Sequence, residues 1–520
     1  MASDPVSLLA ALMQNKDLPQ SRYCLVSRER IEFTADMPAR TTAATSSDVA
    51  AVFSRGIPWI SEECSLRWLG DRLLYFPDGI SNRRRISIVS SRLRQRLDQE
   101  VWWFDLLRTL VLQSDSQTET IVTVAQTAAC AAAFRAAQLF ARPIIHFSLP
   151  DDVAGSPPSM TEWMQMCQQQ NPADTSVVGI PEVCRVFVSP EWSGKPLDSD
   201  ACQASALPGS ELPLGDRVLI AASSRIYTLS VRPKGVVSRV LELLLNDAEL
   251  RDRPLLLACN ANGELPSAAD SLPAGWVAWL LQPFAYESAA SEPATFPHSS
   301  ASPSEGCASV IEIAPKAETS ASDPVCDPDN WLLHWTRAKL GPWPGESHDD
   351  FLDAMILQTE SADHSAMATL LRIISDRRLA ASSEGIRGGH AVVSFTAVSL
   401  SEFRDRRVFR NHRHRFDFEP WGIGICKAAL LGLGARPVIY GQTDDWLKLG
   451  PDERSLFQKA TEAGATNNCA EQEWRVVGDV DLSQLPADAI CVFVENVESA
   501  AVVARHTLWK VIETPQQPRS

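Results

Sequence analysis

Three short polar motifs in the C-terminal third of the chain hold the residue types that are best suited to chemistry. Each motif lies on or beside an apolar stretch that is typical of a β-strand. Residues two apart in a strand point to the same side, so each motif can present a pair of polar groups to one ligand. In chain order the motifs are His334-Trp335-Thr336-Arg337, Val393-Ser394-Phe395-Thr396 and Glu471-Gln472-Glu473-Trp474-Arg475.

These groups suit the cleavage of the bond between nicotinamide and ribose in NAD. That reaction passes through an oxocarbenium-like transition state, which a facing carboxylate stabilises. We assign this role to Glu473 and expect Glu471, on the same side of the strand, to orient an acceptor. We expect the hydroxyls of Ser394 and Thr396 to order the carboxylate and the ribose. These four side chains are the predicted catalytic residues.

The rest of an NAD molecule needs polar and aromatic partners. We predict that His334, Thr336 and Arg337 hold the adenylate and phosphate half, because cationic and polar groups bind phosphate strongly. An aromatic surface must clamp the nicotinamide, and Tyr440 is the candidate that we assign to that role, with Trp421 beside it. Packing in the core or at its rim is the more common use of such a side chain. His334 suits a hydrogen-bonded core position as well as a ligand contact.

The order of the motifs resembles that of ADP-ribosyltransferases, which carry a basic residue or His on a first strand, Ser-x-Thr/Ser on a second and Glu-x-Glu on a later one. The resemblance implies an NAD-dependent ADP-ribosyltransferase or NAD glycohydrolase, with NAD as substrate. The same region looks like bacterial phage-defence proteins of the abortive-infection type and, more distantly, DNA-modifying ADP-ribosyltransferase toxins, which implies a role in defence. The segments that carry this wider likeness are 365–379, 418–425, 434–441 and 473–482.

A non-catalytic interpretation stays open beside the enzymatic one. Glu473 could form a structural ion pair, for instance with Arg436, in a nucleotide-binding or regulatory protein. The segment 403–416 is rich in Arg and His and suits either nucleic-acid phosphates or salt bridges to an acidic body. The acceptor of any modification, protein or nucleic acid, is therefore left open. No Gly-x-Ser-x-Gly or His-Glu-x-x-His motif is present, and we expect no metal site.

The N-terminal half alternates apolar strands with helical segments. The pattern predicts strands at 85–92, 120–124, 143–147, 217–221, 226–230 and 254–258, with helices at 101–113, 125–141 and 236–246. Continuous apolar strands that alternate with helices are typical of a parallel sheet covered on both faces. We therefore predict a Rossmann-like α/β domain, followed by an α+β domain that carries the three motifs.

Polar residues follow two of these predicted strands, where open α/β sheets bind their ligands. They are Ser91 and Arg92 at the end of the first strand, and Arg232, Lys234 and Gly235 between a later strand and its helix. A helix N-terminus with basic neighbours is suited to a phosphate, and we predict a nucleotide there. Solvated loops are the alternative interpretation. The strand order loosely resembles nucleotide-sensing domains of the SLOG type, although the Gly-x-Gly-x-x-Gly fingerprint is absent.

Length and composition set the wider organisation. A chain of 520 residues suggests several domains. We predict a mixed segment at 1–80, the α/β domain at 81–260, a linker rich in Pro, Ser and Ala at 261–330, and the α+β domain at 331–512. A strand is expected at 310–313 within the linker. The net charge of −16 argues against broad nucleic-acid binding. Scattered cysteines and the lack of a long apolar run predict a cytoplasmic protein without a membrane span.

Overall fold

The computed structural model forms two compact units. The first unit comprises residues 1–291 together with 348–359, and the second comprises 292–347 and 360–520. The expected strand at 310–313 lies outside the described residues. The residues that the structure describes are 23–26, 54–55, 59–70, 72–76, 82–150, 159, 162–163, 166–167, 182–190, 211–258, 279–281, 330–399, 402, 409–410, 415–416, 418–460 and 472–514.

The first unit is built on a mostly parallel sheet, as its apolar strands predicted. In its described part the strand order is β10-β9-β8-β4-β5-β6-β7-β3-β1-β2, and all strands from β10 to β7 run parallel. The strands are β1 (Tyr23–Val26), β2 (Ser54–Arg55), β3 (Arg72–Tyr75), β4 (Arg84–Ser90), β5 (Glu119–Val124), β6 (Ile144–Ser148), β7 (Val183–Val188), β8 (Arg225–Ser230), β9 (Leu255–Ala258) and β10 (Trp279–Leu281). This is an α/β architecture of the Rossmann-like kind.

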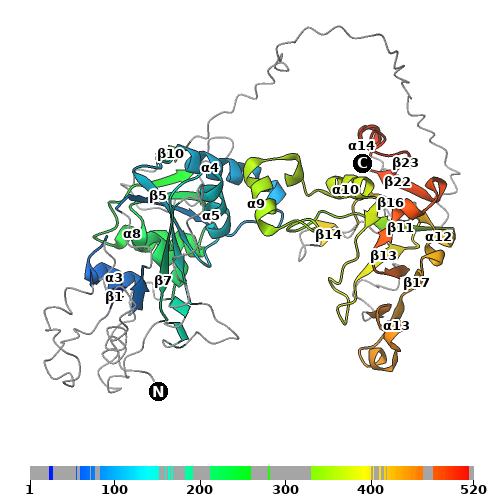
Figure 1. The fold of residues 1–520 in the computed structure, drawn as a ribbon, viewed down its shortest axis with the longest axis horizontal. Helices are drawn as coiled ribbons and strands as arrows, with labels where there is room; N and C mark the ends of the chain where they lie inside the picture. Colours follow the sequence, from blue (N-terminus) through cyan, green and yellow to red (C-terminus); the bar gives the residue numbers. More distant parts are fainter. Residues whose placement is uncertain are drawn as a thin grey trace, which may run out of the picture. The chain divides into compact units, whose positions relative to one another are not determined.

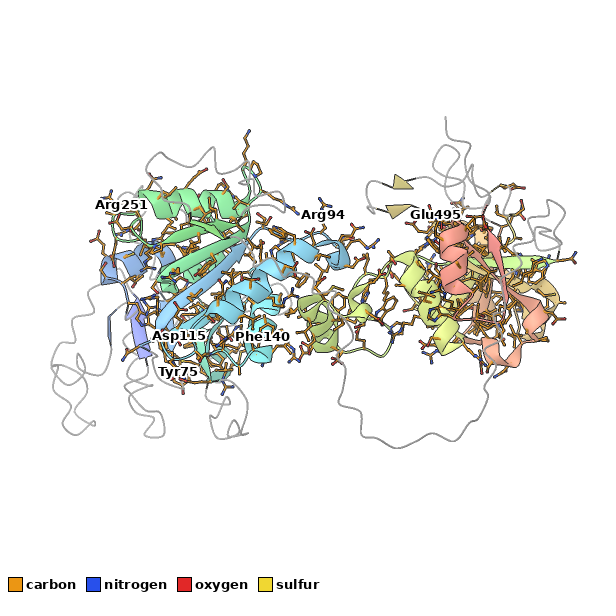
Figure 2. All side chains as sticks on the ribbon, turned by 90° about the horizontal axis from the view of Figure 1, so that it is seen from above. Tyr75, Arg94, Asp115, Phe140, Arg251 and Glu495 are labelled. Atoms are coloured by element: carbon orange, nitrogen blue, oxygen red, sulfur yellow. The ribbon has the colours of Figure 1, made fainter. Side chains whose placement is uncertain are left out.

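Helices cover both faces of this sheet (Figure 1). One group of helices in mutual contact is α4, α5 and α9, and the other is α3, α7 and α8. Figure 2 shows the side chains that fill the space between these helices and the sheet. The helices are α3 (Glu62–Leu69), α4 (Val101–Gln113), α5 (Cys130–Leu139), α7 (Leu214–Ala222), α8 (Val236–Asn246) and α9 (His348–Leu357).

The segment 217–221 is a helix and not the strand that its apolar run predicted. It forms most of α7, in which every residue from Arg217 to Ala222 is buried. A short run that is apolar on all sides has no periodicity by which a helix and a strand can be told apart. The only charged side chain of this run, Arg217, donates to the carbonyls of Leu212 and Trp68, at 3.2 and 3.0 Å.

Helix α9 belongs to the first unit although its sequence lies within the predicted α+β domain. It packs against α4 and α5. Arg135 on α5 forms a two-bond ion pair with Asp353, with N···O distances of 2.5 and 2.6 Å. Arg108 on α4 donates to the carbonyl of Ile356, at the C-terminal end of α9. The chain therefore returns to the first unit after the first strand of the second.

The second unit is built on a largely antiparallel sheet. The order of its described strands is β17-β20-β13-β11-β16-β22-β23, with β22 and β23 parallel. The strands are β11 (Trp331–Trp335), β13 (Val392–Thr396), β16 (Gly422–Cys426), β17 (Arg436–Pro437), β20 (Glu473–Val477), β22 (Ile490–Val494) and β23 (Lys510–Glu513). Two-stranded pairs join β12 (Arg378–Leu379) to β21 (Val480–Asp481), β14 (Phe409–Arg410) to β15 (Arg415–Phe416), and β18 (Ile439–Gly441) to β19 (Phe457–Lys459).

Helices complete the second unit and confirm the predicted α+β class. They are α10 (Ala366–Asp376), α12 (Lys427–Gly432), α13 (Pro451–Arg454) and α14 (Val497–Val503). A hydrophobic core joins the central strands to α10, α12 and α14. Among the described residues of either unit, no helix has the length and apolar character needed to cross a membrane.

Candidate functional site

The three sequence motifs lie on neighbouring strands of the second unit. Strand β13 is flanked by β20 on one side and β11 on the other. Ser394 is opposite Arg475 in the β13–β20 pair, and Thr396 is opposite Glu473. Residues directly opposite one another in an antiparallel pair point to the same face. These four side chains therefore share one face of the sheet.

Glu473 is held by donors from two of these strands. Its Oε1 atom accepts from the Ser394 hydroxyl at 2.7 Å and from Arg475 Nε at 2.9 Å. Its Oε2 atom accepts from Arg475 Nη2 over a longer 3.3 Å. The carboxylate side chain is 17% exposed. The predicted contact between Ser394 and Glu473 is present, and one carboxylate oxygen is less engaged than the other.

The partner of Glu473 is Arg475 and not the Arg436 suggested from the sequence. The Arg475 side chain is 1% exposed. Arg436 stands opposite Arg475 in the β17–β20 pair. Glu473 and Arg475 are two residues apart on one strand, which brings their side chains to the same face. This spacing was the signal in the sequence that could have identified the pair.

Glu471 and Glu473 were predicted to share one side of a strand, but only Glu473 belongs to β20. The strand begins at Glu473, and Gln472 before it has a φ of +45°, in the left-handed region. Alternation of side chains holds only along extended backbone, so it does not place Glu471, which lies outside the described residues. Tyr440, on β18, does lie beside the site, because its hydroxyl accepts from the Glu473 backbone N–H at 3.4 Å.

His334 lies next to the single position at which β11 and β13 pair. Strands β11 and β13 are bridged at Leu333 and Thr396, whereas β13 and β20 pair over five positions. Beyond the bridge, His334 Nδ1 lies 2.9 Å from the carbonyl oxygen of Ser394. Burial lowers the pKa of His334, the hydrogen bond to Ser394 opposes that shift, and the charge of Arg337 adds to it. A neutral imidazole that donates from Nδ1 leaves Nε2 as an acceptor.

Two of the predicted hydroxyls are used inside the fold. Thr336 is 1% exposed and donates to the carbonyl oxygens of Ala366 and Trp421, at 2.9 and 3.2 Å. Thr396 is 5% exposed and accepts from the backbone N–H of Val398 at 3.1 Å. The hydrogen bonds of both side chains to backbone groups therefore favour a structural role over a ligand contact. Arg337, by contrast, is exposed.

The candidate residues of the first unit lie at the point where its strand order reverses. From β4 the chain proceeds one way through β5, β6 and β7, and β8 and β9 then lie on the other side of β4. Such switch points form the ligand crevice of open α/β sheets. Here the Ser91 hydroxyl accepts from the Arg232 backbone N–H at 2.9 Å, and Arg232 Nη2 donates to the Arg92 carbonyl at 2.6 Å. The two loops are therefore joined.

Lys234 and Gly235 form the turn into α8. Lys234 is exposed and has a φ of +59°, while the Gly235 N–H donates to the Arg232 carbonyl at 3.0 Å. Gly235 is the N-cap of α8 and offers no capping side chain, so the cap residue does not satisfy the first N–H groups of this helix through a side chain. An acidic neighbour was missed from the sequence. Burial raises the pKa of Asp216, on the first turn of α7, and the charge of Arg92 opposes the shift.

Comparison with known proteins adds one structural likeness. No protein-family model matches the chain, and no curated protein is similar to it. The X-ray structure of DNA processing protein A (DprA) from Streptococcus pneumoniae is similar at a TM-score of 0.26 and 13% identity, over 43% of this chain and 67% of that chain. Within the described ranges, no group of three or more His, Cys, Asp or Glu side chains is placed to hold a metal ion.

Proposed function

We propose that the second unit cleaves the bond between nicotinamide and ribose in NAD, as an ADP-ribosyltransferase or NAD glycohydrolase. The observation that carries this proposal is the geometry of Glu473. Its carboxylate is held by Ser394 from the neighbouring strand and by Arg475 from its own, and it keeps an exposed fraction of 17%. A fixed and partly accessible carboxylate is what an oxocarbenium-like transition state requires.

In this reaction the C–N bond to nicotinamide breaks, and both of its electrons leave with the nicotinamide nitrogen. Glu473 stabilises the positive charge that develops on the ribose. Water or another nucleophile then forms a bond to the anomeric carbon and loses a proton. Ser394 keeps the carboxylate in position, and His334 and Arg337 are the candidates for the adenylate half. Tyr440, whose hydroxyl accepts from the Glu473 backbone N–H, is the candidate for the aromatic contact with nicotinamide.

Incubation of the full chain with NAD, followed by chromatography of free nicotinamide, tests the proposal. We expect release in proportion to protein concentration. Cell lysate added in a parallel reaction supplies acceptors, in case transfer and not hydrolysis is the activity. An absence of nicotinamide in both reactions would overturn the proposal.

A structural role for Glu473 is the alternative, and the burial of Arg475 favours it. A charged guanidinium that is 1% exposed requires a paired anion. If Glu473 serves only this purpose, the unit is a non-catalytic binding or regulatory module. Loss of Glu473 would then lower the melting temperature and change no ligand-dependent property.

We further propose that the switch point of the first unit binds the phosphate of a nucleotide. The proposal is supported by the exposed basic side chains of Arg92, Arg232 and Lys234 beside the start of α8. Backbone N–H groups at a helix start and basic side chains together favour a phosphate. Titration of purified protein with nucleoside monophosphates, nucleoside diphosphates and dinucleotides identifies the class of nucleotide that binds.

The double variant Arg232→Ala with Lys234→Ala tests the phosphate site. We expect it to weaken nucleotide binding at least tenfold without a change in the melting temperature of the free protein. Arg251→Ala is the matched control, because Arg251 is exposed after α8 and forms an ion pair with the neighbouring Asp252. Equal affinities in the double variant and the wild type would remove the proposal.

A further inference from the structure

Arg475 is hydrogen-bonded through every N–H group that its guanidinium carries. A guanidinium has five N–H donors, one on Nε and two on each of Nη1 and Nη2. Nε and Nη2 donate to the two carboxylate oxygens of Glu473, at 2.9 and 3.3 Å. The other three donors face β19 and the residues before it. They bond to the carbonyls of Ser455 and Phe457, at 3.1 and 3.0 Å, and to the side-chain oxygen of Gln458, at 2.8 Å.

The bonds to β19 hold the guanidinium in place independently of Glu473. Gln458, which accepts one of them, is opposite Tyr440 in the parallel pair of β18 and β19. The Tyr440 hydroxyl in turn accepts from the backbone N–H of Glu473. The pair β18–β19 therefore supports Glu473 twice, once through its backbone and once through Arg475.

The arrangement is more specific than charge neutralisation requires. A buried ion pair is often no more stabilising than well-packed apolar residues of similar volume. Here the planar fork of Arg475 fixes the rotation of the Glu473 carboxylate and draws Oε1 toward Ser394. Oε2 then keeps the single longer bond and is the oxygen with more capacity left to accept a further hydrogen bond. A lysine, with three donors on one nitrogen, cannot reproduce this geometry.

We infer that Arg475 is a positioning residue for Glu473, which it orients from the platform formed by β18 and β19. This inference rests on the proposed cleavage of NAD, which gives the orientation its purpose. The segment between Ile439 and Lys459 would thus hold the reacting carboxylate in position.

The test is Arg475→Lys in the full chain, read by nicotinamide release and by a crystal structure of the variant. A carboxylate displaced from its reactive position costs about 100-fold in rate. We expect kcat to fall by about that factor, with the KM for NAD unchanged within about twofold. In the crystal we expect the Glu473 carboxylate to leave the Ser394 hydroxyl.

Arg217→Lys is the matched control for destabilisation. Arg217 is also a buried arginine, 6% exposed, and it bonds to backbone carbonyls in the first unit. We expect Arg217→Lys to lower the melting temperature and leave kcat unchanged. If Arg475→Lys only lowers the melting temperature and keeps kcat, Arg475 is structural and the inference is wrong.

The crystal structure separates this outcome from failure of the proposed function. Wild-type protein that releases no nicotinamide removes the NAD reaction, whereas a displaced carboxylate in Arg475→Lys still establishes that Arg475 positions Glu473. A carboxylate that keeps its bond to Ser394 in the variant overturns the inference whether or not NAD is cleaved.

Discussion

At the scale of single residues, the site depends on how Glu473 is held. Three donor atoms bond to its carboxylate, one from Ser394 and two from Arg475. The contact with Ser394 was predicted from the Ser-x-Thr motif. The contribution of Arg475 was not, because its effect depends on β19, which is distant in sequence and has no motif of its own. Side-chain alternation could relate Glu473 to Arg475, but it could not show what surrounds them.

Ser394→Ala removes one of the donors to Glu473. A hydrogen bond to a charged group contributes roughly 1.5–3 kcal/mol, and 1.4 kcal/mol corresponds to about tenfold in rate. We expect kcat for nicotinamide release to fall about tenfold or more while the fold is retained. Ser483→Ala is the control, since the Ser483 hydroxyl bonds to Asp481 on the surface of the same unit. Equal rates in both variants would show that the Ser394 hydroxyl has no part in the reaction.

His334 makes stability depend on pH in a defined direction. Burial lowers its pKa in the folded protein, so the unfolded chain takes up the proton first as pH falls. The contribution of neutral His334 is therefore full above about pH 6.5 and is lost below it, toward the lower folded-state pKa. Between pH 7 and pH 5 the free energy of unfolding should fall less in His334→Asn than in the wild type, because asparagine at position 334 does not titrate. Parallel pH curves for the two proteins would contradict this.

At the scale of elements, the sequence predicted strands and helices well where periodicity or punctuation was clear. Helix α4 matches its predicted range, and the strands of the three motifs were all expected. The error at α7 arose because a fully buried run has no polar face. The packing of α9 in the first unit was beyond local pattern, because the pairing of Arg135 with Asp353 joins residues more than 200 positions apart.

The attachment of α9 is testable through that ion pair. The side chains of Arg135 and Asp353 are 24% and 22% exposed. Solvent screening limits the value of such a pair, and we expect Arg135→Ala to lower the free energy of unfolding by about 1 kcal/mol. Asp349→Ala, which removes a more exposed and more distant acid, should have a smaller effect. The exchange of Arg135→Asp with Asp353→Arg should recover part of the loss. No recovery would show that the pair does not hold α9.

At the scale of the whole molecule, the two units each have a hydrophobic core of their own. The class of each unit followed from its sequence, because apolar strands alternate with helices along the first unit and are mixed with helices in the second. The path of the chain between the units did not. It leaves the second unit after β11, forms α9 in the first, and returns for α10.

A ligand of one unit should stabilise that unit in a thermal scan. A non-hydrolysable NAD analogue at 100 times its Kd adds about 2.7 kcal/mol to the free energy of unfolding of the unit that binds it. In calorimetry we expect the analogue to raise the midpoint temperature of the unfolding transition of the second unit. Arg217→Lys identifies the other transition, since it weakens the first unit. A shift confined to the transition that Arg217→Lys lowers would place the NAD site in the first unit.

The most direct test of the central claim is Glu473→Gln, measured in parallel for nicotinamide release and for melting temperature. The variant keeps the shape of the side chain and removes its charge. We predict that release is abolished while the protein stays folded, with a melting temperature that is lowered because the buried Arg475 loses its paired anion. Glu498→Gln, at an exposed acid of α14 in the same unit, should keep full activity. Full release by Glu473→Gln, or a lowered melting temperature with no change in any NAD-dependent property, would contradict a catalytic Glu473.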